Sequence, residues 1–283
     1  MKRNLSFHEK VHWALACNEI ENEFAQHCFY HGNGEQRPGY ATSVKWSERE
    51  DLSGTHRFGA LLGRKGIDNW TAGMFKAYDA AYERLVEAFP DVEGMNHGQL
   101  AEFAMHTLAS PIIEVSGDCM TAKVSFYTPG VITCNRNSNG QKFGLWLWER
   151  YGEDWSFEKV EGEEYGEWRV LHNMVSPDCG ALIDAENWAE AENHTLEYYG
   201  VIDCGSGGPE GIDIPGPSHV GYSPVQVPQA DTNPWPEPYE CLDDPGTPKY
   251  IPKPGHGQPY VVVFEGAPGD PRELIRGDSM EKE

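Results

Sequence analysis

The chain has 283 residues, of which 39% are hydrophobic and 12% aromatic, and it carries a formal net charge of -23. This apolar content is enough for a sizeable core and excludes a chain that is disordered throughout. The negative charge repels phosphate backbones and anionic lipid headgroups, so neither nucleic acid nor a membrane surface is an expected partner.

Residues 1–24 contain charged side chains throughout and no apolar run of signal-peptide length. No stretch of the chain approaches the roughly 18 apolar residues of a membrane span. The 7 cysteines are odd in number and form no Cys-x-x-Cys pair. We interpret them as free thiols in a reducing compartment and expect a cytoplasmic protein.

Two helices are predicted before residue 90. The first begins with Ser6 and Glu9, which form a capping-box pair, and ends at Gly32. Its face is marked by residues three or four apart: Trp13, Cys17, Ile20, Phe24, His27 or Cys28, and His31. A second helix is predicted from near Asp68 until Pro90 ends it.

From residue 103 onwards the pattern changes to strands joined by turns. The strand "HTLASPIIEV" turns at "SGD" into "CMTAKVSFYTPGVIT", and "QKFGLWLWERYGEDWSFEKV" and "EWRVLHNMV" follow. Pro111 interrupts the first of these, which predicts a β-bulge or a sheet edge there. One or two short strands are expected between the helices. Helices followed by strands with no intervening helix predict an α+β domain with an antiparallel meander.

After about residue 203 the composition shifts, because 15 of the 20 prolines lie between Pro209 and Pro271. A disordered tail is one interpretation of this composition. The aromatic residues spaced along the tail favour a Pro-rich arm that packs on the domain or on a partner subunit. A short strand is possible at 260–266. We therefore expect an α+β domain over 1–185 and an extended C-terminal arm over 186–283.

Histidines that could carry chemistry occur at two places in the first half of the chain. His106 opens the first long strand, and His27, Tyr30 and His31 lie at the end of the first helix. A lone strand histidine is often structural, so its role depends on its neighbours. His27 and His31 share a helix face at a spacing that can hold zinc, but no third ligand has a diagnostic spacing. A cluster of this kind can equally serve acid–base chemistry.

Aromatic residues and a further histidine lie in the later strands. Alternation in "KFGLWLWERY" places two sets on opposite faces: Phe143, Leu145, Leu147, Glu149 and Tyr151 on one, and Gly144, Trp146, Trp148 and Arg150 on the other. Packing and an aromatic wall for a flat substrate are both possible roles for Trp146 and Trp148. In the next strand, alternation predicts that His172 shares an inward face with Trp168 and Val170.

Four of these motifs appear in the order found in SnoaL-like proteins of the nuclear transport factor 2-like superfamily. They are "GALLGRKGI" (59–67), "HTLASPIIEVSGDCMTA" (106–122), "WERY" (148–151) and "WRVLH" (168–172). The chain resembles this group over about residues 7–180. The superfamily includes ketosteroid isomerase, scytalone dehydratase, a bile-acid dehydratase, polyketide cyclases and many non-enzymes. The resemblance implies a cone-shaped, strongly curved antiparallel sheet packed on N-terminal helices around an apolar pocket.

The resemblance also implies roles for individual residues. Its dehydratases keep a pocket histidine at the position of His106 and a tyrosine near that of Tyr30. We expect a cofactor-independent lyase or isomerase that acts on a small hydrophobic cyclic compound, such as a steroid, polyketide or polyphenol. His106 would be the general base, and Tyr30, with Tyr127, would donate hydrogen bonds to the developing oxyanion. The acid that those dehydratases carry one strand later is absent from "SFYTPG", which is why a histidine is the expected base.

Other residues are expected to assist. His27 or His172 would return the proton or orient the base, and the residues expected to contact the substrate are Trp146, Trp148, His31 and Phe24. No cofactor and no metal are expected. One alternative is a non-catalytic module for ligand binding or assembly, and another is a metal-dependent enzyme using His27 and His31. The aromatic outer face of the sheet favours a homodimer or higher oligomer, with the tail reaching across.

Overall fold

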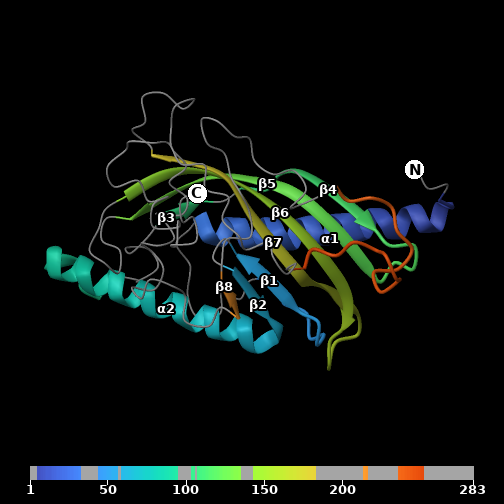
Figure 1. Ribbon diagram of the computed structural model, residues 1–283, viewed down its shortest axis with the longest axis horizontal. Coiled ribbons are helices and arrows are strands. Elements are labelled where there is room, and N and C mark those ends of the chain that lie inside the picture. Colours follow the sequence, from blue (N-terminus) through green and yellow to red (C-terminus); the bar gives the residue numbers. More distant parts are fainter. Residues whose placement is uncertain are drawn as a thin grey trace, which may run out of the picture.

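The computed structural model describes residues 5–32, 44–56, 59–94, 103–105, 107–134, 143–182, 213–215 and 235–251. Within these ranges a large, curved, open sheet packs against a long helix, with a second long helix beside it (Figure 1). This confirms the predicted α+β class and the curved sheet. The cone shape, the division at residue 185 and the C-terminal arm stay predictions.

Helix α1 (Phe7–Gly32) has the predicted start and end. The backbone N–H of Ser6 donates to Glu9 Oε2 at 2.7 Å, and the N–H of Glu9 donates to Ser6 Oγ at 3.3 Å, which confirms the capping box. The buried face of α1 recurs every four residues: Ala16, Ile20, Phe24 and Cys28. Residues 7–15 are all exposed, so Trp13 lies outside the core face that the sequence predicts.

Helix α2 (Gly63–Ala88) begins earlier than the position near Asp68 predicted from the sequence. Two N–H groups at its start find distant acceptors: Leu62 N donates to Asp213 Oδ2 at 2.7 Å, and Gly63 N donates to Leu52 O at 2.7 Å. These bonds satisfy donors that have no partner within the helix. Pro90 ends α2 as predicted and begins the 3-10 helix η1 (Pro90–Val92).

The sheet has the strand order β3-β5-β6-β7-β1-β2-β8, and β4 also pairs with β5. Its strands are β1 (Ser53–His56), β2 (Gly59–Leu62), β3 (Phe103–Met105), β4 (Ala109–Val115), β5 (Thr121–Cys134), β6 (Phe143–Lys159), β7 (Gly166–Leu182) and β8 (Ile214–Pro215). β4 to β7 form the predicted antiparallel meander, while β1 joins β7 in parallel. β8 comes from the Pro-rich part of the chain and was not predicted.

The face of the sheet that packs on α1 is called the inner face, and the opposite one the outer face. Tyr151 and Trp155 of β6 lie in the core with α1, so the residues between them in the alternation, such as Asp154, point outward. The predicted alternation of this strand is therefore confirmed at Tyr151. The core on the inner face joins α1 to β4, β5, β6 and β7.

Two bulges interrupt the ladders. The β4–β5 register shifts between Ala109 and Ile112, as Pro111 predicts. In β7, Val170 pairs with Trp155 but His172 pairs with Asp154, so Leu171 is an extra residue. Because one extra residue reverses the alternation, Trp168 and Val170 face α1 while His172 faces outward. The prediction that His172 shares their face is wrong for this reason.

Residues 235–251, here called the C-terminal segment, lie against the outer face (Figure 1, orange to red). Gly117 N donates to Tyr239 O at 3.0 Å and Asp118 N donates to Glu240 O at 3.1 Å, so the segment binds the Gly-Asp turn between β4 and β5. Leu242 packs with Leu171 and Tyr239 in a buried cluster. The strand expected at 260–266 lies outside the described residues.

Each cysteine whose side chain is described is a free thiol, as predicted. In the part of the chain that the structure describes, no helix combines the length and the apolar composition that a membrane crossing requires.

Candidate functional site

A group of aromatic and polar side chains meets between the C-terminal half of α1 and the inner face. The helix supplies residues three and four apart, and the strands supply alternate residues, so both periodicities converge there. We call this group the inner-face cluster; its members are Phe24, His27, Cys28, Phe126, Tyr151, Glu153 and Asn173.

Aromatic rings form most of the cluster. The ring of Phe24 lies 4.1 Å from that of Phe126 and 5.7 Å from that of Tyr151, measured between centroids. Phe126 and Tyr151 stack with an interplanar angle of 18°. The imidazole of His27 lies 5.3 Å from the ring of Phe24. These contacts place His27 at the edge of an apolar, aromatic environment.

Glu153 is the acidic group of the cluster and is fully buried. Its carboxyl accepts a hydrogen bond from Trp155 Nε1 at 2.7 Å and another from Asn173 Nδ2 at 2.7 Å. Burial raises the pKa of Glu153 to about 8, the charge of Asp154 adds to this, and the two hydrogen bonds oppose it. At neutral pH the side chain is therefore mainly a neutral acid with a proton to donate. The thiol of Cys28 lies near this carboxyl. Burial, and to a smaller extent the charge of Glu153, raise the pKa of the thiol to about 12.

A separate charged group lies on the outer face around Asp154. Its carboxylate accepts from Lys123 Nζ at 2.6 Å, from His172 Nδ1 at 2.8 Å and from the backbone N–H of Tyr250 at 2.7 Å. The ammonium of Lys123 also lies 5.2 Å from the ring centroids of Tyr239 and Tyr250. Since both tyrosines belong to the C-terminal segment, this group fastens the segment to the sheet. It does not face the inner-face cluster.

The structure divides the residues predicted for the site. Phe24 and His27 belong to the inner-face cluster. Four others lie on the outer face by strand alternation and pairing: Tyr127, Trp146, Trp148 and His172. Tyr127 is 47% exposed and Trp146 is 37% exposed, and neither faces Phe24.

Three predicted residues cannot be placed by their side chains. His106 and the side chains of Tyr30 and His31 lie outside what the structure describes. His106 directly follows β3, which pairs with β5 at 131–133 and lies beside α1. The roles predicted for these three residues stay predictions.

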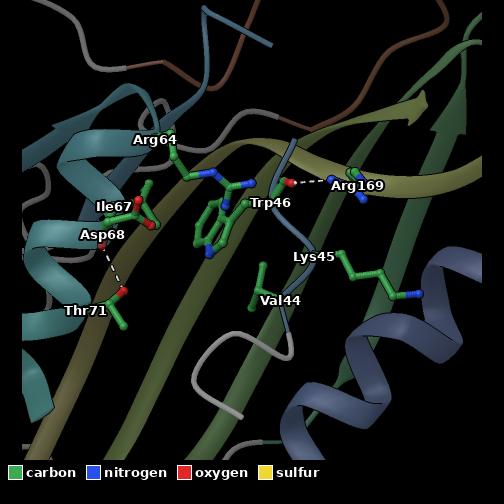
Figure 2. Close-up of a pocket in the computed structure, with 8 residues that line it drawn as sticks. All are labelled: Val44, Lys45, Trp46, Arg64, Ile67, Asp68, Thr71 and Arg169. Carbon is green, nitrogen blue, oxygen red and sulfur yellow. Dashed lines mark hydrogen bonds between the residues drawn. The ribbon is translucent and has the colours of Figure 1, made fainter. Parts of the chain in front are cut away.

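A cleft of about 200 Å³ opens between residues 44–46, the start of α2 and β7 (Figure 2). Three cations line it, and each is paired: Lys45 with Glu23 at 2.7 Å, and Arg64 and Arg169 with Glu48 at 2.6 and 2.9 Å. Glu167 also pairs with Lys45 at 3.0 Å and with Arg169 at 2.8 Å, so three carboxylates balance the three cations and the cleft offers no net positive charge to an anion. Its remaining walls include Trp46 and Ile67.

Metal binding finds no support in the ranges that the structure describes, where no three His, Cys, Asp or Glu side chains gather as ligands. The metal-dependent alternative with His27 and His31 stays untested, because the side chain of His31 is not described.

Glu153 and Asn173 were missed from the sequence. Extending the alternation of "KFGLWLWERY" two residues beyond Tyr151 would have placed Glu153 on the inner face. No comparable signal existed for Asn173. The bulge at Leu171 sets its orientation, and a bulge without a Pro or Gly leaves no mark in the pattern.

No protein-family model matches the chain, and no curated protein matches its sequence. Several solved structures do match it. A candidate scytalone dehydratase from Novosphingobium aromaticivorans has a TM-score of 0.40 and 12% identity over 62% of this chain and 93% of its own. The chain resembles NTF2-like proteins. An NTF2-like superfamily protein from Salmonella enterica has a TM-score of 0.36 and 18% identity, covering 62% of this chain and 99% of its own.

A hexachlorocyclohexane dehydrochlorinase, LinA-type3 from Novosphingobium barchaimii, has a TM-score of 0.37 and 12% identity, covering 63% of this chain and 97% of its own. The NTF2-like superfamily is the one that the four sequence motifs resemble. All three TM-scores lie below 0.5.

Proposed function

We propose that the protein is a cofactor-independent lyase or isomerase that transfers protons on a small hydrophobic cyclic compound at the inner-face cluster. Steroids, polyketides and polyphenols are the substrate classes that fit this chemistry. They present flat, apolar rings to aromatic side chains and carry the carbonyl or hydroxyl oxygen that an acid can protonate.

The observation that carries the proposal is Glu153. A fully buried carboxyl with a pKa of about 8, on the same strand face as the rings of Tyr151 and Trp155, can donate a proton or a strong hydrogen bond at neutral pH. An ionised carboxylate in water could do neither. A neutral acid in apolar surroundings also favours an uncharged substrate, since a charged one would lose its hydration on entry.

The roles divide between a base and an acid. His106 is the proposed base, which removes a proton from the carbon next to a carbonyl or β to a hydroxyl. Glu153 is the proposed acid: it stabilises the enolate oxygen in an isomerisation, or gives its proton to the departing hydroxyl, which leaves as water. Tyr30 would share the hydrogen bonding to the oxyanion, and His27, at the edge of the cluster, would return the proton to the substrate or orient the base.

Proton transfer can be measured before the natural substrate is known. Cyclic ketones and β-hydroxyketones of the three classes are incubated with the protein in heavy water, and deuterium gained at carbon is read by mass spectrometry. We expect the wild-type protein to accelerate exchange for at least one class. Glu153→Gln should lower that rate about 10²- to 10⁴-fold, because the amide has no acidic proton.

The matched control is Glu163→Gln, which makes the same change in the exposed β6–β7 turn and should leave the exchange rate unaltered. Equal exchange by wild type and Glu153→Gln would remove Glu153 from the mechanism. Tight binding of these compounds with no exchange by the wild-type protein would instead support the non-catalytic binding module.

A further inference from the structure

Helix α1 carries a second apolar stripe on the side facing away from the sheet. Phe7 is 77% exposed, Val11 40%, Leu15 55% and Phe29 65%. On a helical wheel Phe7, Val11 and Phe29 fall within one narrow arc, roughly opposite the core residues, and Leu15 flanks it. A surface helix normally presents polar side chains there, so a row of large exposed apolar residues indicates an interaction surface.

Smaller residues complete the stripe between the two phenylalanines. Ala14, Asn18, Asn22 and Ala25 lie in the same arc and are all exposed. Asn22 Nδ2 donates to Asn18 Oδ1 at 3.2 Å, so the middle of the stripe is polar and ordered. Small side chains let another helix approach closely, and a polar residue within an apolar seam fixes its register.

The stripe is symmetric about Asn18. Position 7 lies as far before residue 18 as position 29 lies after it, and the same holds for 11 and 25 and for 14 and 22. If two such helices run antiparallel across a two-fold axis at Asn18, Phe7 meets Phe29 of the other copy and Val11 meets Ala25. A two-fold interface requires this property. If residue i of one copy contacts residue j of the other, then residue j of the first copy must contact residue i of the second.

The charges of the helix favour the same orientation. Glu19, Glu21 and Glu23 all follow Asn18 in α1, whereas the exposed part before Asn18 contains Glu9 and Lys10, which balance each other. A parallel pair would set three glutamates against three, but an antiparallel pair sets them against a neutral half. The helix dipoles also oppose each other only in the antiparallel arrangement.

We propose that α1 pairs antiparallel with α1 of a second copy of this chain, about a two-fold axis near Asn18. The pairing differs from one through the outer face of the sheet, part of which the C-terminal segment already covers. It leaves the inner-face cluster on the opposite side of α1, so both copies keep their sites.

The first test is the molar mass of the full chain by light scattering over a range of concentrations. The wild-type protein should show twice the chain mass, and Val11→Glu should return it to the mass of one chain, because it buries a carboxylate in the seam. His12→Glu is the matched control: it puts the same side chain on the next residue, which points away from the stripe, and the dimer should persist. A single-chain mass for the wild type at every concentration would overturn the proposal.

The second test reads the orientation from cysteine cross-linking, with the wild-type chain as the baseline for its own thiols. Asn18→Cys should give a disulfide-linked dimer on mild oxidation, because residue 18 meets itself at the axis. Phe7→Cys alone should not cross-link, whereas Phe7→Cys combined with Phe29→Cys should. Cross-linking of Phe7→Cys alone would indicate a parallel pair, and failure of Asn18→Cys would exclude an axis there.

Discussion

At the scale of single residues, Glu153 and Asp154 are consecutive acidic residues that lie in different environments on opposite faces of the sheet. Glu153 is neutral, buried among rings and held by two donors, whereas Asp154 accepts three hydrogen bonds on the other side of the strand. The alternation of β6 separates them, and the sheet lies between their environments. The acid proposed for the site and a carboxylate held by ion pairs can therefore occupy consecutive positions.

Glu153 should make the stability of the protein depend on pH. Its pKa rises from 4.5 to about 8 on folding, so between these values the native state holds a proton that the unfolded state has lost. The free energy of unfolding should therefore decrease as the pH rises through this window, by about 1.4 kcal/mol per pH unit from this residue.

Urea unfolding at several pH values, compared with Glu153→Gln, measures this contribution. The variant cannot ionise at this position and should lose less stability between about pH 5 and pH 8. If the two proteins show the same pH dependence, the carboxyl is already ionised in the native state and cannot be the neutral acid proposed for the site.

At the scale of elements, the Gly-Asp turn between β4 and β5 is the docking point of the C-terminal segment. A Cβ atom at Gly117 would collide with the carboxylate of Glu240 and would lie 3.2 Å from its Cα. The two hydrogen bonds from this turn to the segment require that close approach. The glycine is thus needed for contact between elements that are far apart in sequence.

Gly117→Val should displace the segment from the turn, because the branched side chain meets the backbone of Glu240 as well as its movable carboxylate. We expect faster proteolysis within residues 235–251 and a greater exposure of the Tyr239 ring, read by hydrogen exchange of the neighbouring amides. Met120→Val changes an exposed residue of the same turn and should alter neither. Equal protection in both variants would show that the segment does not depend on this contact.

The elements that the sequence predicted well are those fixed by local rules. The capping box at Ser6, the helix end at Pro90 and the bulge near Pro111 each follow from residues within one turn of the feature. The features that it missed depend on distant partners. The start of α2 is held by Leu52 and Asp213, and the orientation of His172 depends on the unmarked bulge at Leu171.

The candidate site follows the same division. The helix periodicity placed Phe24 and His27 correctly against the sheet, because that face is decided within α1 itself. Tyr127 was grouped with them as a hydrogen-bond donor and His172 from an uninterrupted alternation, although strand register, set by the pairing of β5, β6 and β7, puts both on the outer face. The acidity of Glu153 arises from burial, which only the assembled fold provides.

At the scale of the whole molecule, the net charge of -23 acts on any pairing between copies. Two such chains repel each other at long range, and the repulsion is screened within about 10 Å at 0.1 M salt. The proposed contact between the two α1 helices consists of apolar side chains and uncharged asparagines. Salt should therefore weaken the repulsion between the chains without weakening this contact.

Added sodium chloride should therefore strengthen the dimer. Sedimentation equilibrium at a low and a high salt concentration measures the dissociation constant, which should fall as salt is raised. A dimer that dissociates when salt is added would instead be held by ion pairs across the interface, and the apolar stripe would not be its main contact.

The extra residue at Leu171 has a consequence for how this chain can change over time. Before Leu171, the side chains of Trp168 and Val170 in β7 lie in the core, and directly after it His172 faces outward and bonds to Asp154. Substitutions on the inner face should therefore leave the bond between His172 and Asp154 intact, because these side chains lie on the opposite face of the strand. If Leu171 paired in the ladder and the bulge were lost, His172 would turn towards the core face. We therefore expect β7 to tolerate many substitutions but not the loss of this bulge.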